Sequence, residues 1–151
     1  MNQKKKGMRL YNVLFPFWML ILFPQMWLII LPGNFIIDSL VMLVSMKVLK
    51  IEEKKQWYKK CIFKIFAIGI LSDIVGSAYM FLMTAVLEVG VMGDELYLTI
   101  PALVLSGVLI FVFNHRFTFK TMEAPLRYRL SLIFAIATAP YTFLIPTSWL
   151  Y

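Results

Sequence analysis

Two aspartates interrupt apolar stretches of this sequence. Asp38 is the first charged residue after Arg9, and Asp73 is the only one between Lys64 and Glu88. A charged side chain at the centre of a bilayer costs about 2.5–3.5 kcal/mol on insertion scales, so such residues usually face a bundle interior or a water-filled path. The functional interpretation is that both acids belong to a path for an ion, a proton or a polar lipid headgroup. The structural alternative is a protonated aspartate that hydrogen-bonds helices together.

Small and hydroxyl-bearing residues accompany both acids at helical spacing. Three stripes result: Asn34, Asp38 and Ser45; Gly69, Asp73, Gly76, Ser77 and Thr84; Ser131, Ala135, Thr138 and Thr142. Small residues let helix backbones approach, and hydroxyls hydrogen-bond between helices. We therefore predict that the stripes meet. The candidate residues of the transport path or polar bundle interior are Asp73, Asp38, Asn34, Ser77, Thr84 and Thr138.

The composition explains why these acids must be considered in a membrane. Of the 151 residues, 61% are hydrophobic and 15% are charged, against about 45–50% and 25% in soluble domains. A soluble core of this length would need more polar surface than the chain supplies. We predict an all-α integral membrane bundle in a single transmembrane domain, residues 1–151.

Five apolar segments are candidates for membrane-spanning helices, each near the roughly 20 residues that a span needs. They cover about 11–31, 34–49, 62–87, 97–113 and 130–150. The first pair is divided at Pro32-Gly33-Asn34, where proline stops a helix and glycine permits a reversal. One long kinked helix over 11–49 is the alternative. The hairpin places Asp38 one turn from the outer end of its helix and about 12 Å in depth from Asp73, which argues against a direct carboxylate pair.

The basic residues predict the orientation. All 15 lysines and arginines fall in the N-terminal tail, in residues 47–64 or in residues 116–129. Positive charge marks cytoplasmic loops, so five spans give a cytoplasmic N-terminus and an external C-terminus in the inner (plasma) membrane of a bacterium. The first segment is interpreted as an uncleaved signal anchor. Because orientation explains the charge, we expect membrane lipids and no nucleic acid as partners.

The sequence lacks the residue sets that metal binding and nucleophilic catalysis require. Cys61 and His115 stand alone, with no paired metal-ligand spacing, and no nucleophile–base set is visible. We expect no enzyme activity, no metal and no cofactor. In the fifth segment Pro140 and Pro146 interrupt the helix, which opens a cavity in some transporters; prolines are also common in ordinary membrane helices.

Two short motifs resemble a known family. Residues 113–120 read FNHRFTFK, and Gly33-Asn34 precedes Asp38. These stretches resemble motifs of the GtrA-like family, small membrane proteins linked to translocating polyprenyl-phosphate sugars. That family usually has four spans with both motifs on one side of the membrane, whereas three predicted spans separate them here and place them on opposite sides. The resemblance implies lipid-phosphate contact at Arg116, Asn114 and Thr118, with Asn34 and Asp38 as further matching positions.

The leading hypothesis is therefore transport of an ion, a proton or a lipid-linked polar headgroup. A small bundle needs further helices around any path, so we expect a homo-oligomer. The alternative is a non-catalytic anchoring or regulatory subunit with a membrane-complex partner.

Overall fold

The computed structural model describes residues 24–86 and 95–144, and it contains helices and no strands within them. The elements are α1 (Pro24–Val48), α2 (Lys54–Phe81), the π-helical η3 (Leu82–Val86), α3 (Glu95–Phe113), the π-helical η4 (Asn114–Thr118), α4 (Ala124–Ala137) and the 3-10 turn η5 (Tyr141–Leu144). Membership in the all-α class is thus confirmed for the described residues.

The predicted hairpin at residues 32–34 is wrong. α1 continues through Pro32 for 25 residues, about 37 Å of helix. Proline inside a helix removes one hydrogen bond. A helix break would instead leave four N–H and four C=O groups without partners, each at a cost of several kcal/mol in hydrocarbon. The continuous helix is therefore the cheaper arrangement. Residues 11–23 of the predicted first span lie outside the described residues.

Three described helical stretches are long and apolar enough to cross a membrane: Trp27–Val48, Lys54–Val86 and Tyr97–Thr118. The five-span prediction is not supported. The predicted third and fourth spans match the last two stretches, although the third begins earlier, at Lys54. The predicted fifth span is wrong because α4 ends at Ala137 after 14 residues, about 21 Å, which is less than the hydrocarbon thickness. Residues 145–151 lie outside the described residues.

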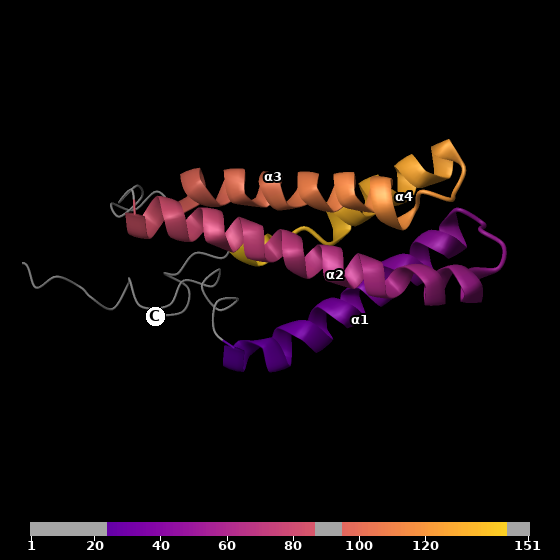
Figure 1. Cartoon of the computed structure of the whole chain (residues 1–151), viewed down its shortest axis with the longest axis horizontal. Coiled ribbons are helices and arrows are strands. Elements are labelled where there is room, and N and C mark those ends of the chain that lie inside the picture. The colour runs from indigo at the N-terminus through magenta and orange to yellow at the C-terminus, as the bar shows by residue number, and fades with distance from the viewer. Residues whose placement is uncertain (1–23, 87–94, 145–151) are drawn as a thin grey trace, which may run out of the picture.

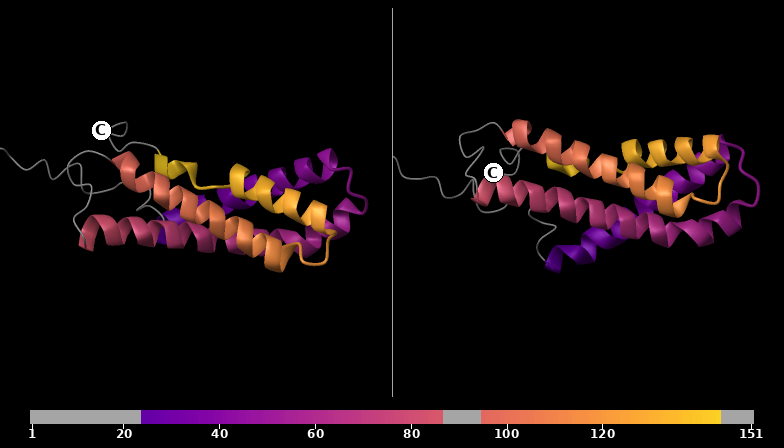
Figure 2. Two further views of the ribbon diagram at one scale, coloured as in Figure 1. Left: turned by 90° about the horizontal axis from the view of Figure 1, so that it is seen from above. Right: turned by 45° about the horizontal axis from the view of Figure 1, so that its top comes forward.

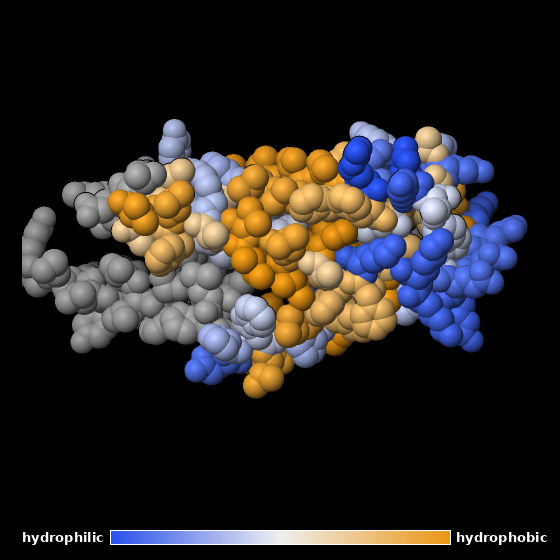
Figure 3. Space-filling view, in the orientation of Figure 1, coloured by the Kyte–Doolittle hydropathy of each residue, from blue (hydrophilic) through white to orange (hydrophobic). Residues whose placement is uncertain are grey.

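The connections α1–α2 and α3–α4 lie at the same end of the molecule (Figures 1 and 2). α2 and α3 run side by side, while α1 crosses α2 obliquely and α4 packs beside α3. Hydrophilic side chains gather at that end, and apolar ones cover the middle (Figure 3). We call it the basic end, because it holds the lysines and arginines of residues 47–64 and 116–129. Lys4, Lys5, Lys6 and Arg9 lie outside the described residues.

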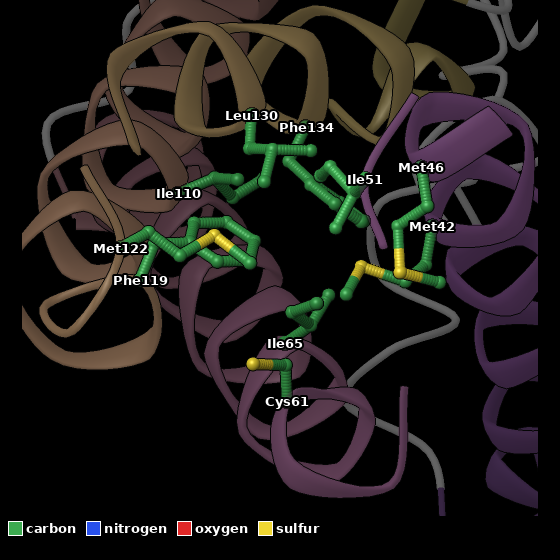
Figure 4. Packing of buried hydrophobic residues seen from close by; sticks show 10 residues of the cluster. All are labelled: Met42, Met46, Ile51, Cys61, Ile65, Ile110, Phe119, Met122, Leu130 and Phe134. Atoms are coloured by element: carbon green, nitrogen blue, oxygen red, sulfur yellow. The ribbon is translucent and has the colours of Figure 1, made fainter. Parts of the chain in front are cut away.

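Two apolar clusters hold the helices together. The larger one joins all four α-helices toward the basic end (Figure 4) and contains Met42, Met46, Ile51, Cys61, Ile65, Ile110, Phe119, Met122, Leu130 and Phe134. The smaller one packs Met80, Leu98, Ala102 and Phe143 between α2, α3 and η5. Along α2 the two clusters are separated by residues 66–79, and Asp73 lies in that interval.

Gly76 allows the close approach of α2, α3 and η5. A Cβ at this position would collide with the Ser106 hydroxyl and would lie 2.7 Å from Cε2 of Phe143. Ser106 donates a hydrogen bond of 2.9 Å to the carbonyl of Ser72, one turn earlier on α2. Backbone contact of this kind is typical of membrane helices with small residues at their interface.

The substitution Gly76→Ala is expected to destabilise the protein by about 1–3 kcal/mol, because overpacking forces neighbouring side chains or backbones apart. Gly33→Ala is the matched control, since no atom lies within 4 Å of a Cβ placed there and alanine favours a helix by about 1 kcal/mol over glycine. Thermal unfolding in detergent measures both. Equal melting temperatures for the two variants would contradict the packing at Gly76.

Candidate functional site

A cavity of about 290 Å³ lies between α1, α2 and the segment that follows α4. Its lining residues are Ile30, Gly33, Asn34, Ile37, Asp38, Gly69, Asp73, Ala137, Thr138, Ala139, Pro140, Tyr141 and Thr142. Three parts of the chain that are far apart in sequence thus contribute to one site. Both aspartates singled out in the sequence line this cavity.

The register of α1 against α2 places Asp38 and Asp73 one helical turn apart. Nδ2 of Asn34 donates a hydrogen bond of 3.2 Å to Oδ2 of Asp73. One turn later on α1 and one turn earlier on α2, a Cβ at Gly69 would lie 3.6 Å from Oδ2 of Asp38. Because the helices are antiparallel, the i, i+4 pair on α1 faces the i, i+4 pair on α2. The absence of a side chain at Gly69 leaves room for the Asp38 carboxylate against α2.

The expected depth of Asp38 is corrected by the continuity of α1. The hairpin placed it near an outer helix end, whereas it lies near the middle of Trp27–Val48. Asp73 is likewise well inside Lys54–Val86. The predicted depth difference of about 12 Å therefore does not hold, and both acids line the same mid-span cavity.

Both carboxylates are buried, with Asp38 3% exposed and Asp73 8% exposed. Oδ1 of Asp73 has no hydrogen-bond partner among the described residues. None of the described residues that line the cavity is a lysine, arginine or histidine, and the described residues form no salt bridge with either acid. Among the described residues, two acidic groups thus share one site without a basic partner.

The third wall exists because α4 stops early. Pro140 has no N–H to offer the carbonyl of Ile136, and the hydroxyl of Tyr141 donates to that carbonyl instead. Thr138 closes the helix end by donating both its N–H (2.9 Å) and its Oγ1 (2.8 Å) to the carbonyl of Phe134. Irregular backbone at membrane depth is tolerated where it lines a cavity, and residues 137–142 do line it.

Four of the six candidate path residues line the cavity, namely Asn34, Asp38, Asp73 and Thr138. Ser77 and Thr84 do not. Ser77 is fully buried, with no hydrogen bond to its Oγ among the described residues, and Thr84 is half-buried in η3.

Sequence reasoning missed six lining residues: Gly33, Tyr141, Ile30, Ile37, Ala137 and Ala139. Gly33 was assigned to a turn, although its spacing of four residues from Ile37 places the two on one helix face. Tyr141 follows Pro140, and that neighbouring break was the available signal for a cavity.

The residues of the family resemblance do not assemble into one site. Asn114 and Thr118 are buried in η4, and their side-chain polar atoms have no hydrogen-bond partners among the described residues. Arg116 is exposed, because it lies two residues from each of them and so on another face of the helix. All three are at the basic end, whereas Asn34 and Asp38 lie in the mid-span cavity.

Comparisons with models of protein families, with curated proteins and with solved structures find no match to this chain. The site must therefore be interpreted from its own geometry. That geometry defines an acidic, mostly apolar-walled cavity inside a helical protein whose described helices are long enough to span a membrane.

A cysteine at position 69 is expected to react with a small cationic methanethiosulfonate reagent, in a Cys61→Ser background. The cavity gives the Gly69→Cys thiol access to water, where the reactive thiolate can form. Leu71→Cys is the control, because Leu71 is 49% exposed on the apolar outer surface and would lie in lipid. Mass spectrometry after timed exposure measures both, and equal labelling of the two positions would contradict a hydrated cavity.

Proposed function

We propose that the protein is a membrane transport protein in which a small cation or a proton crosses the bilayer through the Asp38–Asp73 cavity. The observation that carries this proposal is that two buried carboxylates share a mid-span cavity, and no described residue that lines it is basic. Ionisable groups inside a membrane are costly and typically mark ion or proton pathways. A purely structural role needs one such group at a helix contact, and it needs no cavity.

The charge of the site favours a cation over a phosphate headgroup. A phosphate would face two carboxylates with no lysine, arginine or histidine among the described residues of the cavity wall, and like charges at short range repel. Contact with a lipid phosphate, as the GtrA-like resemblance implies, fits the exposed Arg116 at the basic end better, because a guanidinium matches phosphate geometry.

The proposed orientation has the basic end in the cytoplasm of a bacterial cell, following the distribution of lysine and arginine. α1 then starts near the outer side and ends at the cytoplasmic side. Three described spans and the short α4 are few helices to enclose a path, so we propose that the transporting unit is a homo-oligomer in the plasma membrane.

Asp73→Asn is expected to reduce cation flux to the background of empty vesicles. The amide keeps the size of the carboxyl group and can still accept the Asn34 hydrogen bond, but it carries no negative charge and releases no proton. Uptake of radiolabelled sodium and of methylammonium, and proton flux reported by an entrapped pH dye, measure the effect in proteoliposomes.

Glu123→Gln is the matched control, because Glu123 is an exposed acid at the start of α4, outside the cavity. It should transport as the unmodified protein does. Monodisperse elution in detergent confirms that each variant is folded. If a folded Asp73→Asn variant gave the same flux as the unmodified protein, Asp73 would have no part in the mechanism and the proposed function would be wrong.

A further inference from the structure

Three polar side chains of the cavity, Asn34, Thr138 and Tyr141, each donate a hydrogen bond to the protein. Nδ2 of Asn34 donates to Asp73, Oγ1 of Thr138 donates to the carbonyl of Phe134, and the hydroxyl of Tyr141 donates to the carbonyl of Ile136. A hydroxyl has one proton and two lone pairs, so Thr138 and Tyr141 can still accept. A ligand that suits these acceptors is a hydrogen-bond donor.

The acidic groups add the sign of the charge. Oδ1 of Asp73 is buried and has no partner among the described residues, and Asp38 is 3% exposed on the same cavity. Burying an unpaired acceptor is unfavourable, and more so when the acceptor is charged. A neutral donor satisfies the missing hydrogen bond alone, whereas a cationic donor also balances the negative charge.

The size and walls of the cavity select among cations. Its volume of about 290 Å³ is roughly ten times the 30 Å³ that a water molecule occupies in the liquid, and it lies near the lower limit of small-molecule pockets. Apolar side chains form much of the wall: Ile30, Ile37, Ala137, Ala139 and Pro140. A bare metal ion needs oxygen ligands on most sides, and no group of three or more acidic, histidine or cysteine ligands occurs among the described residues.

We propose that the cavity binds a small organic ammonium ion, whose N–H groups meet Asp73 and Asp38 and whose short apolar chain lies against the isoleucine and alanine wall. This inference rests on the proposed function and names its substrate class. The Asn34 hydrogen bond holds Asp73 by one oxygen, and the other oxygen is buried without a partner among the described residues. Charge-assisted hydrogen bonds of this type are about twice as strong as neutral ones.

The test is equilibrium binding to the purified full-length protein in detergent, measured by calorimetry with three probes. n-Butylammonium carries both charge and apolar chain, n-butanol carries the chain alone, and sodium carries the charge alone. Butylammonium is expected to bind at least about tenfold more tightly than either of the others, as a hydrogen bond to a charged group predicts.

Two variants separate the parts of the site. Asp73→Asn removes charge and should weaken butylammonium binding at least about tenfold. Gly33→Leu adds an isobutyl group to the cavity wall and keeps both carboxylates, because Gly33 lines the cavity and no atom lies within 4 Å of a Cβ placed there. It should abolish butylammonium binding, and it remains informative if Asp73→Asn fails to fold.

The outcomes distinguish the inference of an organic cation from the proposed cation transport on which it rests. Selective butylammonium binding that both variants weaken supports the organic cation. Butylammonium binding no tighter than butanol, together with sodium or proton flux that still needs Asp73, overturns the organic cation and leaves cation transport standing. Absence of both butylammonium binding and Asp73-dependent flux overturns the two proposals together.

Discussion

Peptide groups within a bilayer must find their hydrogen-bond partners inside the protein, because the hydrocarbon offers none. This constraint keeps α1 helical through Pro32, because losing one backbone hydrogen bond is less unfavourable than creating two new helix ends. It also governs the end of α4, where the hydroxyl of Tyr141 supplies the donor that Pro140 lacks. The chain thus departs from regular helix where a cavity and neighbouring side chains accommodate its backbone.

The position of the cavity follows from these two responses to proline. A continuous α1 lies antiparallel to α2 and carries Asn34 and Asp38 to the level of Asp73 and Gly69. The short α4 contributes Leu130 and Phe134 to the larger apolar cluster, and the helix then ends at Ala137. The space that a longer helix would have filled is lined instead by residues 137–142. α1 continues through Pro32, whereas α4 ends before Pro140, and the site depends on both of these outcomes.

Membrane character, helical class and the third and fourth predicted spans follow from long apolar runs that one sequence displays directly. The three polar stripes also name both acids and Thr138, since helical spacing is a local property. Local rules could not predict that the helix continues through Pro32 but ends before Pro140. Each proline costs a similar amount in an isolated helix, and the outcome depends on neighbours: Pro32 is exposed on a helix that α2 supports, whereas Tyr141 stabilises the break at Pro140.

The proposed membrane orientation would account for the basic residues at one end, but it gives no reason to place two acids at mid-span. Their immediate contacts show how the protein holds them. Asn34 fixes one oxygen of Asp73, and the missing side chain at Gly69 lets Asp38 rest against the backbone of α2. Such contacts fix the positions of both carboxylates in advance, which would lower the ordering cost of binding the proposed cation. A group needed only to join two helices would satisfy both of its oxygens at the contact, and the second oxygen of Asp73 has no partner among the described residues.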